Sequence, residues 1–308
     1  MIFLKAVVTG ATGFVGKWLV KNLLENDIEI IAVVRNRKKV SSEWETNEKC
    51  QIIECELKDL KNLDESHKLE NIDLFFHFAW EGTSGDVRFD EKTQLSNVQY
   101  TCDAVNLAKR INCKRFIFAG SIMEYEAISF VGSDDSFPAK GNIYSVAKLT
   151  ADYMAKIFAS NLGLDYINII ISNIYGVGEK SARFVNTMLK RMDNSEKISL
   201  SEGKQLYDFI YVEDAVDAIR LAAVNGKTNN NYYIGNSVQH PLREFVIRMN
   251  NIVGKNAILD FGAFPSNGNY LSYKEFETTK LENEFGFVSK YSFEEGIEKT
   301  LEWIRKES

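Results

Sequence analysis

Residues 5–16, with the sequence KAVVTGATGFVG, constrain the fold more than any other part of the chain. Apolar residues 6–8 predict a short buried strand, and apolar side chains at helical spacing from Phe14 to Leu24 predict a helix. Glycines between them permit a tight turn and let main-chain N–H groups approach a pyrophosphate at the helix N-terminus. The pattern therefore predicts a dinucleotide site, made by Gly10, Thr12, Gly13, Phe14, Val15 and Gly16. An ordinary glycine-rich turn is the alternative.

The composition is that of a globular protein. With 308 residues, of which 45% are hydrophobic and 26% charged, the chain can bury a large core. No apolar run approaches the roughly 20 residues of a membrane span, and the first strand begins without a basic leader and cleavage site. We therefore expect a cytoplasmic protein with no membrane partner.

Charge and metal-binding residue types exclude two further classes of function. The net charge of -6 argues against a nucleic-acid partner, because phosphate binding needs a basic surface. The four cysteines and three histidines lack the spacing of metal ligands, so we expect no metal site.

Apolar runs and helical stretches alternate as far as residue 171, and the runs predict strands at 28–34, 51–54, 73–78, 115–119 and 165–171. Such alternation predicts a Rossmann-like α/β fold, a doubly wound parallel sheet with helices on both faces. Beyond residue 171 it breaks down into a smaller mixed C-terminal lobe. The predicted division is a dinucleotide domain of 1–171, to which 206–225 returns, and a substrate lobe of 172–205 and 226–308. Functional residues should follow the strand ends.

The residue after the second strand predicts the type of dinucleotide. An acid there would accept from the ribose of NAD, whereas a cation would pair with the 2′-phosphate of NADP. The strand is followed by Arg35 in the run RNRKK, so NADP(H) is favoured over NAD(H). A solvated basic loop without a ligand is the alternative.

The next strand ends carry two ambiguous residues. Asp59 could cap the following helix or accept from the adenine amino group, and capping is the commoner role. His77, inside an apolar strand, is more typical of a core histidine than of a catalyst.

The fifth strand leads to Ser121, and Tyr144 and Lys148 follow on one face of a predicted helix. A phenol with a pKa near 10 is a poor acid at neutral pH, but a nearby ammonium stabilises its phenolate. A serine hydroxyl can steady the substrate oxygen. The three residues together predict acid-base chemistry.

The motifs TGATGFVG, HFAW, YSVAK, SNIYGVG and YDFIYVEDAVDAI occur in an order that resembles the extended short-chain dehydrogenase/reductases. The resemblance is closest to their nucleotide-sugar epimerase, dehydratase and ketoreductase branch, and it covers nearly the whole chain. It implies that Tyr144 exchanges the proton, that Lys148 binds the nicotinamide ribose, and that Ser121 touches the reacting oxygen. It also places Asp59, Leu60 and Ala79 at the cofactor, and Asn97 on the helix behind the site.

Two departures from the family narrow the reaction. Sugar dehydratases of the family carry an Asp-Glu pair after the active-site Ser or Thr, where this chain has Ile122 and Met123. Relatives that epimerise before reducing carry a cysteine at the position of Met123. What remains is hydride transfer at a carbonyl, either as a net reduction or as the cycle of a 4-epimerase.

Arg35 favours the reductase, because 4-epimerases of the family usually retain NAD. The resulting prediction is NADPH-dependent reduction of a nucleoside-diphosphate 4-keto-6-deoxy sugar. The positional candidates for substrate contacts are Trp80, Met123, Asn173, Arg183, Leu200 and Tyr207. Tyr207 stands where relatives place an arginine, so a common diphosphate contact is missing.

Three alternatives stay open: a nucleotide-sugar 4-epimerase, a reductase of small ketones, and an NADP-sensing protein without catalysis. Relatives often dimerise through helices equivalent to 95–110 and 142–162. Apolar Val98, Val105 and Leu107 permit a homodimer.

Overall fold

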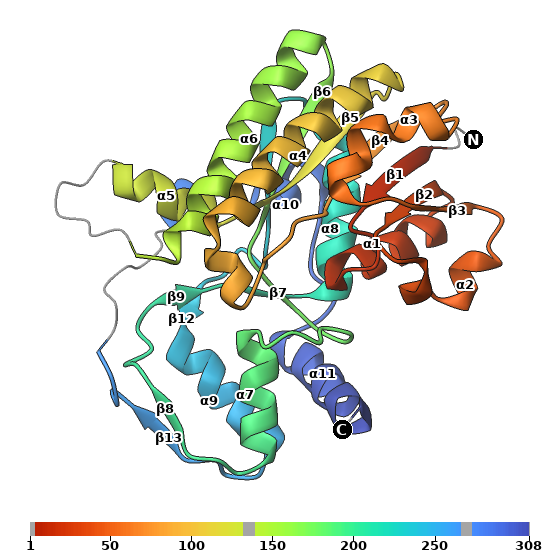
Figure 1. Ribbon diagram of the computed structural model, residues 1–308. Coiled ribbons are helices and arrows are strands. Elements are labelled where there is room, and N and C mark those ends of the chain that lie inside the picture. Colours follow the sequence, from red (N-terminus) through yellow and green to blue (C-terminus); the bar gives the residue numbers. More distant parts are fainter. Residues whose placement is uncertain (1–3, 132–138, 266–272, 308) are drawn as a thin grey trace. The chain divides into compact units, whose positions relative to one another are not determined.

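A computed structural model describes residues 4–131, 139–265 and 273–307 (Figure 1). The chain divides into two compact units, Met1–Ile171 with Val216–Tyr232, and Ser172–Ala215 with Tyr233–Ser308. The sequence predicts that 206–225 returns to the first unit, whereas the segment found there is Val216–Tyr232. The reason is that helix α8 (Val212–Asn225) starts in the second unit and ends in the first, and strand β11 (Asn230–Ile234) leads out again.

A seven-stranded sheet forms the centre of the first unit, in the order β11-β6-β5-β4-β1-β2-β3. All neighbour pairs from β6 to β3 are parallel. The strands are β1 (Lys5–Thr9), β2 (Glu29–Val34), β3 (Cys50–Glu54), β4 (Leu74–His77), β5 (Arg115–Ser121) and β6 (Asp165–Ile171). This order, reversing beside β1, confirms the predicted Rossmann-like fold.

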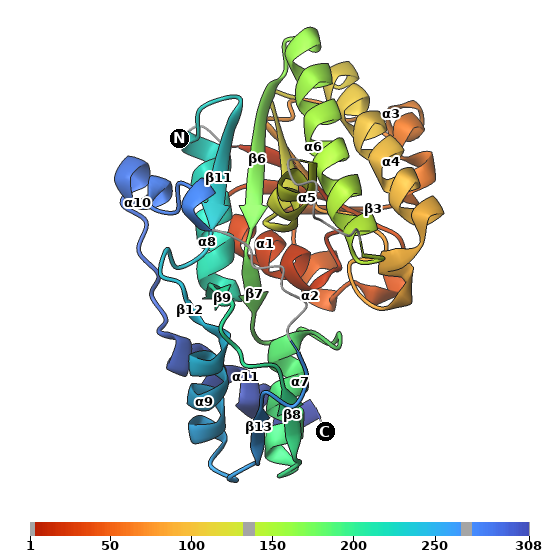
Figure 2. The ribbon, with the colours of Figure 1, turned by 90° about the vertical axis from the view of Figure 1, so that its left-hand side faces the viewer.

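Long helices cover both faces of this sheet, α4 and α6 on one and α1 and α8 on the other (Figure 2). Asn22 on α1 donates to Asp217 on α8 at 2.7 Å, and this hydrogen bond holds the two helices together. The α-helices are α1 (Phe14–Glu25), α2 (Ser42–Glu45), α3 (Leu63–Ser66), α4 (Glu91–Arg110), α5 (Met123–Val131) and α6 (Asn142–Leu162). Short 3-10 helices are η1 (Arg37–Lys39), η2 (Leu57–Asn62) and η3 (Asp86–Phe89).

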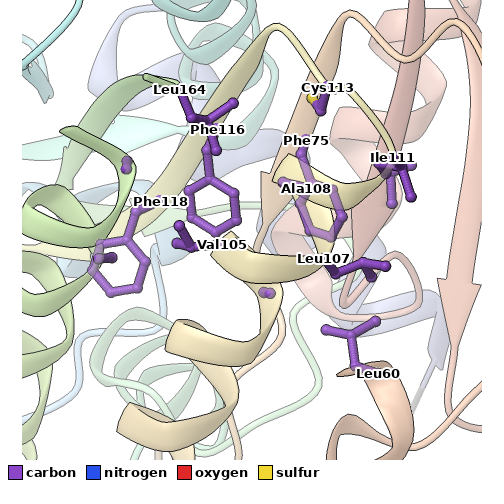
Figure 3. Packing of buried hydrophobic residues seen from close by; sticks show 14 of the residues in the cluster. Leu60, Phe75, Val105, Leu107, Ala108, Ile111, Cys113, Phe116, Phe118 and Leu164 are labelled. Atoms are coloured by element: carbon purple, nitrogen blue, oxygen red, sulfur yellow. The ribbon is translucent and has the colours of Figure 1, made fainter. Parts of the chain in front are cut away.

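The core between the sheet and α4 is built on a row of aromatic rings. The parallel register places Phe75, Phe116 and Tyr166 side by side on adjacent strands. Their rings stack, with centroids 5.4 Å and 6.2 Å apart. Val105 of α4 packs into the same cluster (Figure 3). Burial of this apolar surface holds α4 and its polar N-terminal half in place beside the strand ends.

The second unit is a mixed lobe of short strands and helices. Its elements are β7 (Asn173–Tyr175), α7 (Phe184–Asp193), β8 (Ile198–Leu200), β9 (Leu206–Tyr207), β10 (Phe209–Tyr211), β12 (His240–Pro241), α9 (Leu242–Val253), β13 (Leu259–Phe261), η4 (Tyr273–Glu275), α10 (Lys280–Phe285) and α11 (Phe293–Glu307). Asp208, which is fully buried, accepts from the Tyr233 hydroxyl at 2.7 Å and from the backbone of Asn236 at 2.9 Å. In the parts of the chain described here, no helix is long and apolar enough to cross a membrane.

Candidate active site

The glycine turn between β1 and α1 requires glycine at two positions. Gly10 has a φ of +71°, and a Cβ there would lie 2.7 Å from the backbone nitrogen of Ala79. A Cβ on Gly16 would collide with the carbonyl oxygen of Gly10. The backbones of the turn, of β4's end and of α1 therefore approach each other more closely than other residues allow.

The N-terminus of α1 has the chemistry of an anion site. Gly13 is its N-cap, and among the described residues no side chain accepts there. The N–H groups of the first turn, which includes Phe14 and Val15, are the donors that a helix leaves without intrahelical partners. Thr12 precedes the N-cap and is half-buried. These groups fit the pyrophosphate of a dinucleotide.

Arg35 directly follows β2 and is exposed. Its guanidinium lies 3.6 Å from the carboxylate of Glu81, a residue that follows β4. Both side chains are more than half exposed, so the ion pair contributes little stability and leaves Arg35 accessible to a phosphate.

Asp59 and Leu60 lie within η2 and differ in exposure. Asp59 is exposed and caps no helix, because the N-cap of η2 is Glu56 and that of α3 is Asn62. The capping role expected of Asp59 is therefore wrong. Leu60 is buried in the core cluster, so only its main chain is available to a cofactor.

His77, the last residue of β4, is a neutral core residue. Burial, together with the nearby Lys148 ammonium, lowers its pKa to about 3. Its Nδ1 lies 3.1 Å from the hydroxyl of Thr9, which also accepts from the backbone N–H of Ala79 at 3.3 Å. This arrangement ties the ends of β1 and β4 together and positions half-buried Ala79 beside the glycine turn.

Tyr144 and Lys148 converge on Trp80. Both are buried in α6, one turn apart. The Tyr144 ring meets the Trp80 ring edge to face at 6.1 Å, and the Lys148 nitrogen lies 3.7 Å from the Trp80 ring centre. Lys148 also donates to the carbonyl oxygen of Ala119 on β5 at 2.8 Å. The structure thus brings the predicted acid-base pair to the end of β5.

The pKa of Lys148 is lowered to about 7, chiefly by burial, with the charge of Glu124 acting to raise it and the Arg88 guanidinium to lower it. The lysine is therefore only partly protonated at neutral pH. A group that adds negative charge nearby would favour its protonated form.

Ser121 ends β5, and its hydroxyl accepts from the backbone N–H of Met123 at 3.2 Å. This hydrogen bond does not use the hydroxyl proton of Ser121, which is a donor. Met123, the first residue of α5, is half-buried. Ile122 between them is buried, so both residues after Ser121 are apolar.

Glu124 is a buried acid that the sequence interpretation missed. Its carboxylate accepts from the backbone N–H of Ser121 at 2.7 Å and from the Asn168 amide at 3.0 Å. Burial raises the pKa of Glu124 well above its usual range, and Asp152 adds to the rise. The only sequence signal was an acid three residues after Ser121.

The loop after β4 is tied to α4 by two buried amides. Asn97 accepts from the backbone of Glu81 at 3.0 Å and donates to it at 2.8 Å. Gln94 accepts from the Trp80 indole at 2.9 Å and donates to the carbonyl of Gly82 at 3.1 Å. The hydrogen bond to Gln94 therefore fixes the position of the Trp80 indole, in addition to the packing of its ring.

Four predicted substrate residues lie in the second unit. Asn173 donates to the Asp208 carbonyl at 3.1 Å, and exposed Arg183 lies 3.4 Å from Glu179. Leu200 is buried, and its carbonyl accepts from two backbone N–H groups. The Tyr207 ring stacks on that of Phe209 at 5.5 Å. Of the four, Arg183 is the most exposed. Their contact with substrate stays a prediction.

Within the described ranges, no group of three or more His, Cys, Asp or Glu side chains is placed to hold a metal ion. The four cysteines are free thiols.

Known proteins resemble this chain over nearly its whole length. A model of the "NAD dependent epimerase/dehydratase family" matches residues 6–235. CDP-abequose synthase of Salmonella typhimurium is 24% identical over 98% of this chain and 99% of its own. dTDP-glucose 4,6-dehydratase of Haemophilus influenzae is 22% identical over 96% of each chain.

Solved structures share the fold. A UDP-glucuronic acid 4-epimerase from Bacillus cereus, solved with UDP-glucuronic acid and NAD, superposes with a TM-score of 0.80. It is 20% identical and is matched over 99% of this chain and 100% of its own.

Proposed function

Because this chain belongs to the NAD dependent epimerase/dehydratase family, we propose that it reduces the keto group of a nucleoside-diphosphate 4-keto-6-deoxy sugar with NADPH. The observation that carries the proposal is the buried pair of Tyr144 and Lys148, packed against Trp80 at the end of β5. The relative named CDP-abequose synthase, which by its name makes a CDP-linked sugar, supports the substrate class.

The glycine turn fits the cofactor, since its crowded backbone and the N-terminus of α1 present donors to a pyrophosphate. Arg35 supports NADPH over NADH through its charge beside the 2′-phosphate position. When bound, the cofactor supplies the hydride. Tyr144 gives its phenolic proton to the carbonyl oxygen, Ser121 donates a hydrogen bond to the same oxygen, and Lys148 stabilises the remaining phenolate.

Apolar residues beside Ser121 favour reduction over dehydration. Ile122 is buried and Met123 is half-buried, and neither side chain can exchange a proton with the sugar carbons. Loss of water from a sugar needs an acid and a base beside those carbons.

The direct test is incubation of the purified protein with NADPH and a dTDP-, CDP- or GDP-linked 4-keto-6-deoxy sugar. We expect the absorbance of the reduced nicotinamide to fall with at least one of them. Tyr144→Phe is the matched control, which should bind NADPH and lose turnover. No consumption of NADPH, together with interconversion of two hydroxy sugars, would instead identify a 4-epimerase.

We also propose a homodimer, with an interface that does not include the apolar residues predicted from the sequence. Val98, Val105 and Leu107 are buried in the unit's own core, so they cannot form an interface. The outer faces of the same helices expose other apolar side chains, namely Leu95 on α4 and Val146, Tyr153, Met154 and Ile157 on α6. An exposed apolar stripe of this kind fits a second copy of the chain.

A further inference from the structure

Arg88 stacks on the ring of Tyr144. The central carbon of its guanidinium lies 3.8 Å from the centre of the phenol ring, and its Nη1 donates to the Thr83 carbonyl at 2.9 Å. Arg88 belongs to η3, in the loop between β4 and α4, and Tyr144 belongs to α6. Two segments distant in sequence thus bring a permanent positive charge to the predicted proton donor.

The loop that carries Arg88 has a defined path. The buried amide of Gln94 donates to the carbonyl oxygens of Gly82 and Val87, at 3.1 Å and 3.3 Å. Gly82 has a φ of +71°, and a Cβ there would lie 2.7 Å from the carbonyl oxygen of Val87. The residue before Arg88 is therefore held to α4 on the side of Tyr144.

Arg88 matters because Lys148, the other cation near Tyr144, is only partly charged. Burial lowers the pKa of Lys148 to about 7, so its ammonium loses its proton near neutrality. A guanidinium stays protonated at every pH at which a protein is folded. Arg88 is the cation beside Tyr144 whose charge does not depend on pH.

We propose that Arg88 is a positioning residue that orients the Tyr144 ring and stabilises its phenolate, together with Lys148. The proposal rests on the proposed role of Tyr144 as proton donor. When the phenolic O–H bond breaks, the proton goes to the carbonyl oxygen and the negative charge stays on Tyr144, opposite Arg88. A proton from water then restores the phenol.

The other charged groups near this part of α6 lie on α5, on η3 and on α6 itself. Helix α5 contributes Glu124 and Glu126, and η3 contributes Asp86. Helix α6 contributes Lys148, Asp152 and Lys156. The buried positions of α4 carry no charge. Burial also raises the pKa of Glu124 and of Asp152, so their negative charges are reduced. Lys140, which precedes α6, lies over the ring of Phe89. The cations that contact the rings of Tyr144 and Trp80 are Arg88 and Lys148.

The test is a tyrosinate titration, which needs no substrate. Ultraviolet absorbance is measured against pH for the wild type, Arg88→Gln and Arg88→Lys, each with and without Tyr144→Phe. The difference between the two absorbance curves of each pair is the titration of Tyr144 alone. We expect its midpoint to rise by about one pH unit in Arg88→Gln and to stay near the wild-type value in Arg88→Lys. Circular dichroism checks that each variant is folded.

Arg110→Gln is the matched control for the loss of one arginine charge, because Arg110 pairs with Asp64 at the far end of α4. An unchanged or lower midpoint in folded Arg88→Gln overturns the inference, as does a shift of equal size in Arg110→Gln. Retained turnover in Tyr144→Phe would overturn the proposed function instead, and the titration does not depend on that result.

Discussion

The ammonium nitrogen of Lys148 lies 3.7 Å from the centre of the Trp80 ring. The lysine is buried, and its pKa of about 7 lies well below that of the unfolded chain. Between those two values the unfolded lysine holds a proton that the folded one has released, so the stability of the protein rises with pH from about 7 to about 10. The ring face of Trp80 stabilises the charged form of Lys148 and so reduces the loss of stability that burial of this charge causes.

Trp80→Leu should therefore destabilise the protein more at pH 6 than at pH 9. At pH 6 the variant loses both packing and about 1 kcal/mol of cation–π stabilisation, whereas at pH 9 the folded lysine is neutral and only the pH-independent loss remains. Urea unfolding at both pH values measures the difference. Trp80→Phe keeps a ring face and should show a smaller dependence on pH. Equal destabilisation of Trp80→Leu at both values would contradict the role of the ring.

His77 should make the protein sensitive to acid. The unfolded histidine takes up a proton below pH 6.5, while the buried one stays neutral until about pH 3, so stability falls as the pH drops through this window. The loss between pH 7 and pH 4.5 should be about 3 kcal/mol. His77→Asn keeps a polar partner for Thr9 and does not titrate, so this variant should lose less. Identical acid dependence in the two proteins would rule out His77 as the cause.

Glu124 should tolerate loss of charge better than loss of its hydrogen bonds. Glu124→Ala leaves the backbone N–H of Ser121 and the Asn168 amide without their acceptor, at a cost of about 3 kcal/mol. Glu124→Gln keeps an acceptor and should cost about 1 kcal/mol. Chemical unfolding of both variants at pH 7 gives the comparison. A larger loss in the glutamine variant would show that the negative charge itself is required.

The strands from 28 to 171 and their parallel pairing could be predicted, because apolar runs that alternate with helices favour a parallel sheet. The turn at Gly10 and the approach of Tyr144 to Lys148 also follow from short-range spacing. Arg88 and Glu124 could not be predicted in the same way. The position of Arg88 depends on a loop path set by Gln94, and that of Glu124 depends on Asn168 from another strand.

The buried face of a helix such as α4 could not be predicted from the sequence either. Apolar residues on α4 lie on several sides of the helix, and the sequence does not show which side the sheet covers. Val98 and Val105 are buried, while Leu95 of the same helix is exposed. The core face of α4 is the one that packs against the stacked rings of the sheet, which include Phe116. That contact is formed only in the folded protein.

Arg35→Ala should weaken NADPH binding about 10-fold and leave NADH binding unchanged, because only NADPH carries the phosphate that the guanidinium would meet. Fluorescence titration with each cofactor measures this. Arg37→Ala is the control, since Arg37 is nearby and exposed but pairs with Glu45 at 3.4 Å. Glu81→Gln removes the acid 3.6 Å from Arg35 and should tighten NADPH binding slightly. Equal losses for both cofactors would remove Arg35 from the phosphate site.

Charges on the outer face of α6 should produce a monomer if α6 forms the proposed interface between two copies. Tyr153 and Ile157 are 56% and 54% exposed and lie one turn apart, so glutamate at both places two acids in the centre of the apolar stripe. Two copies related by a twofold axis would bring four acids together, which disfavours association. Sedimentation equilibrium should give a dimer for the wild type and a monomer for the double variant. Val288→Glu changes an exposed apolar residue of the second unit and should leave the dimer intact. A wild type that sediments as a monomer, or a double variant that remains a dimer, would exclude this face.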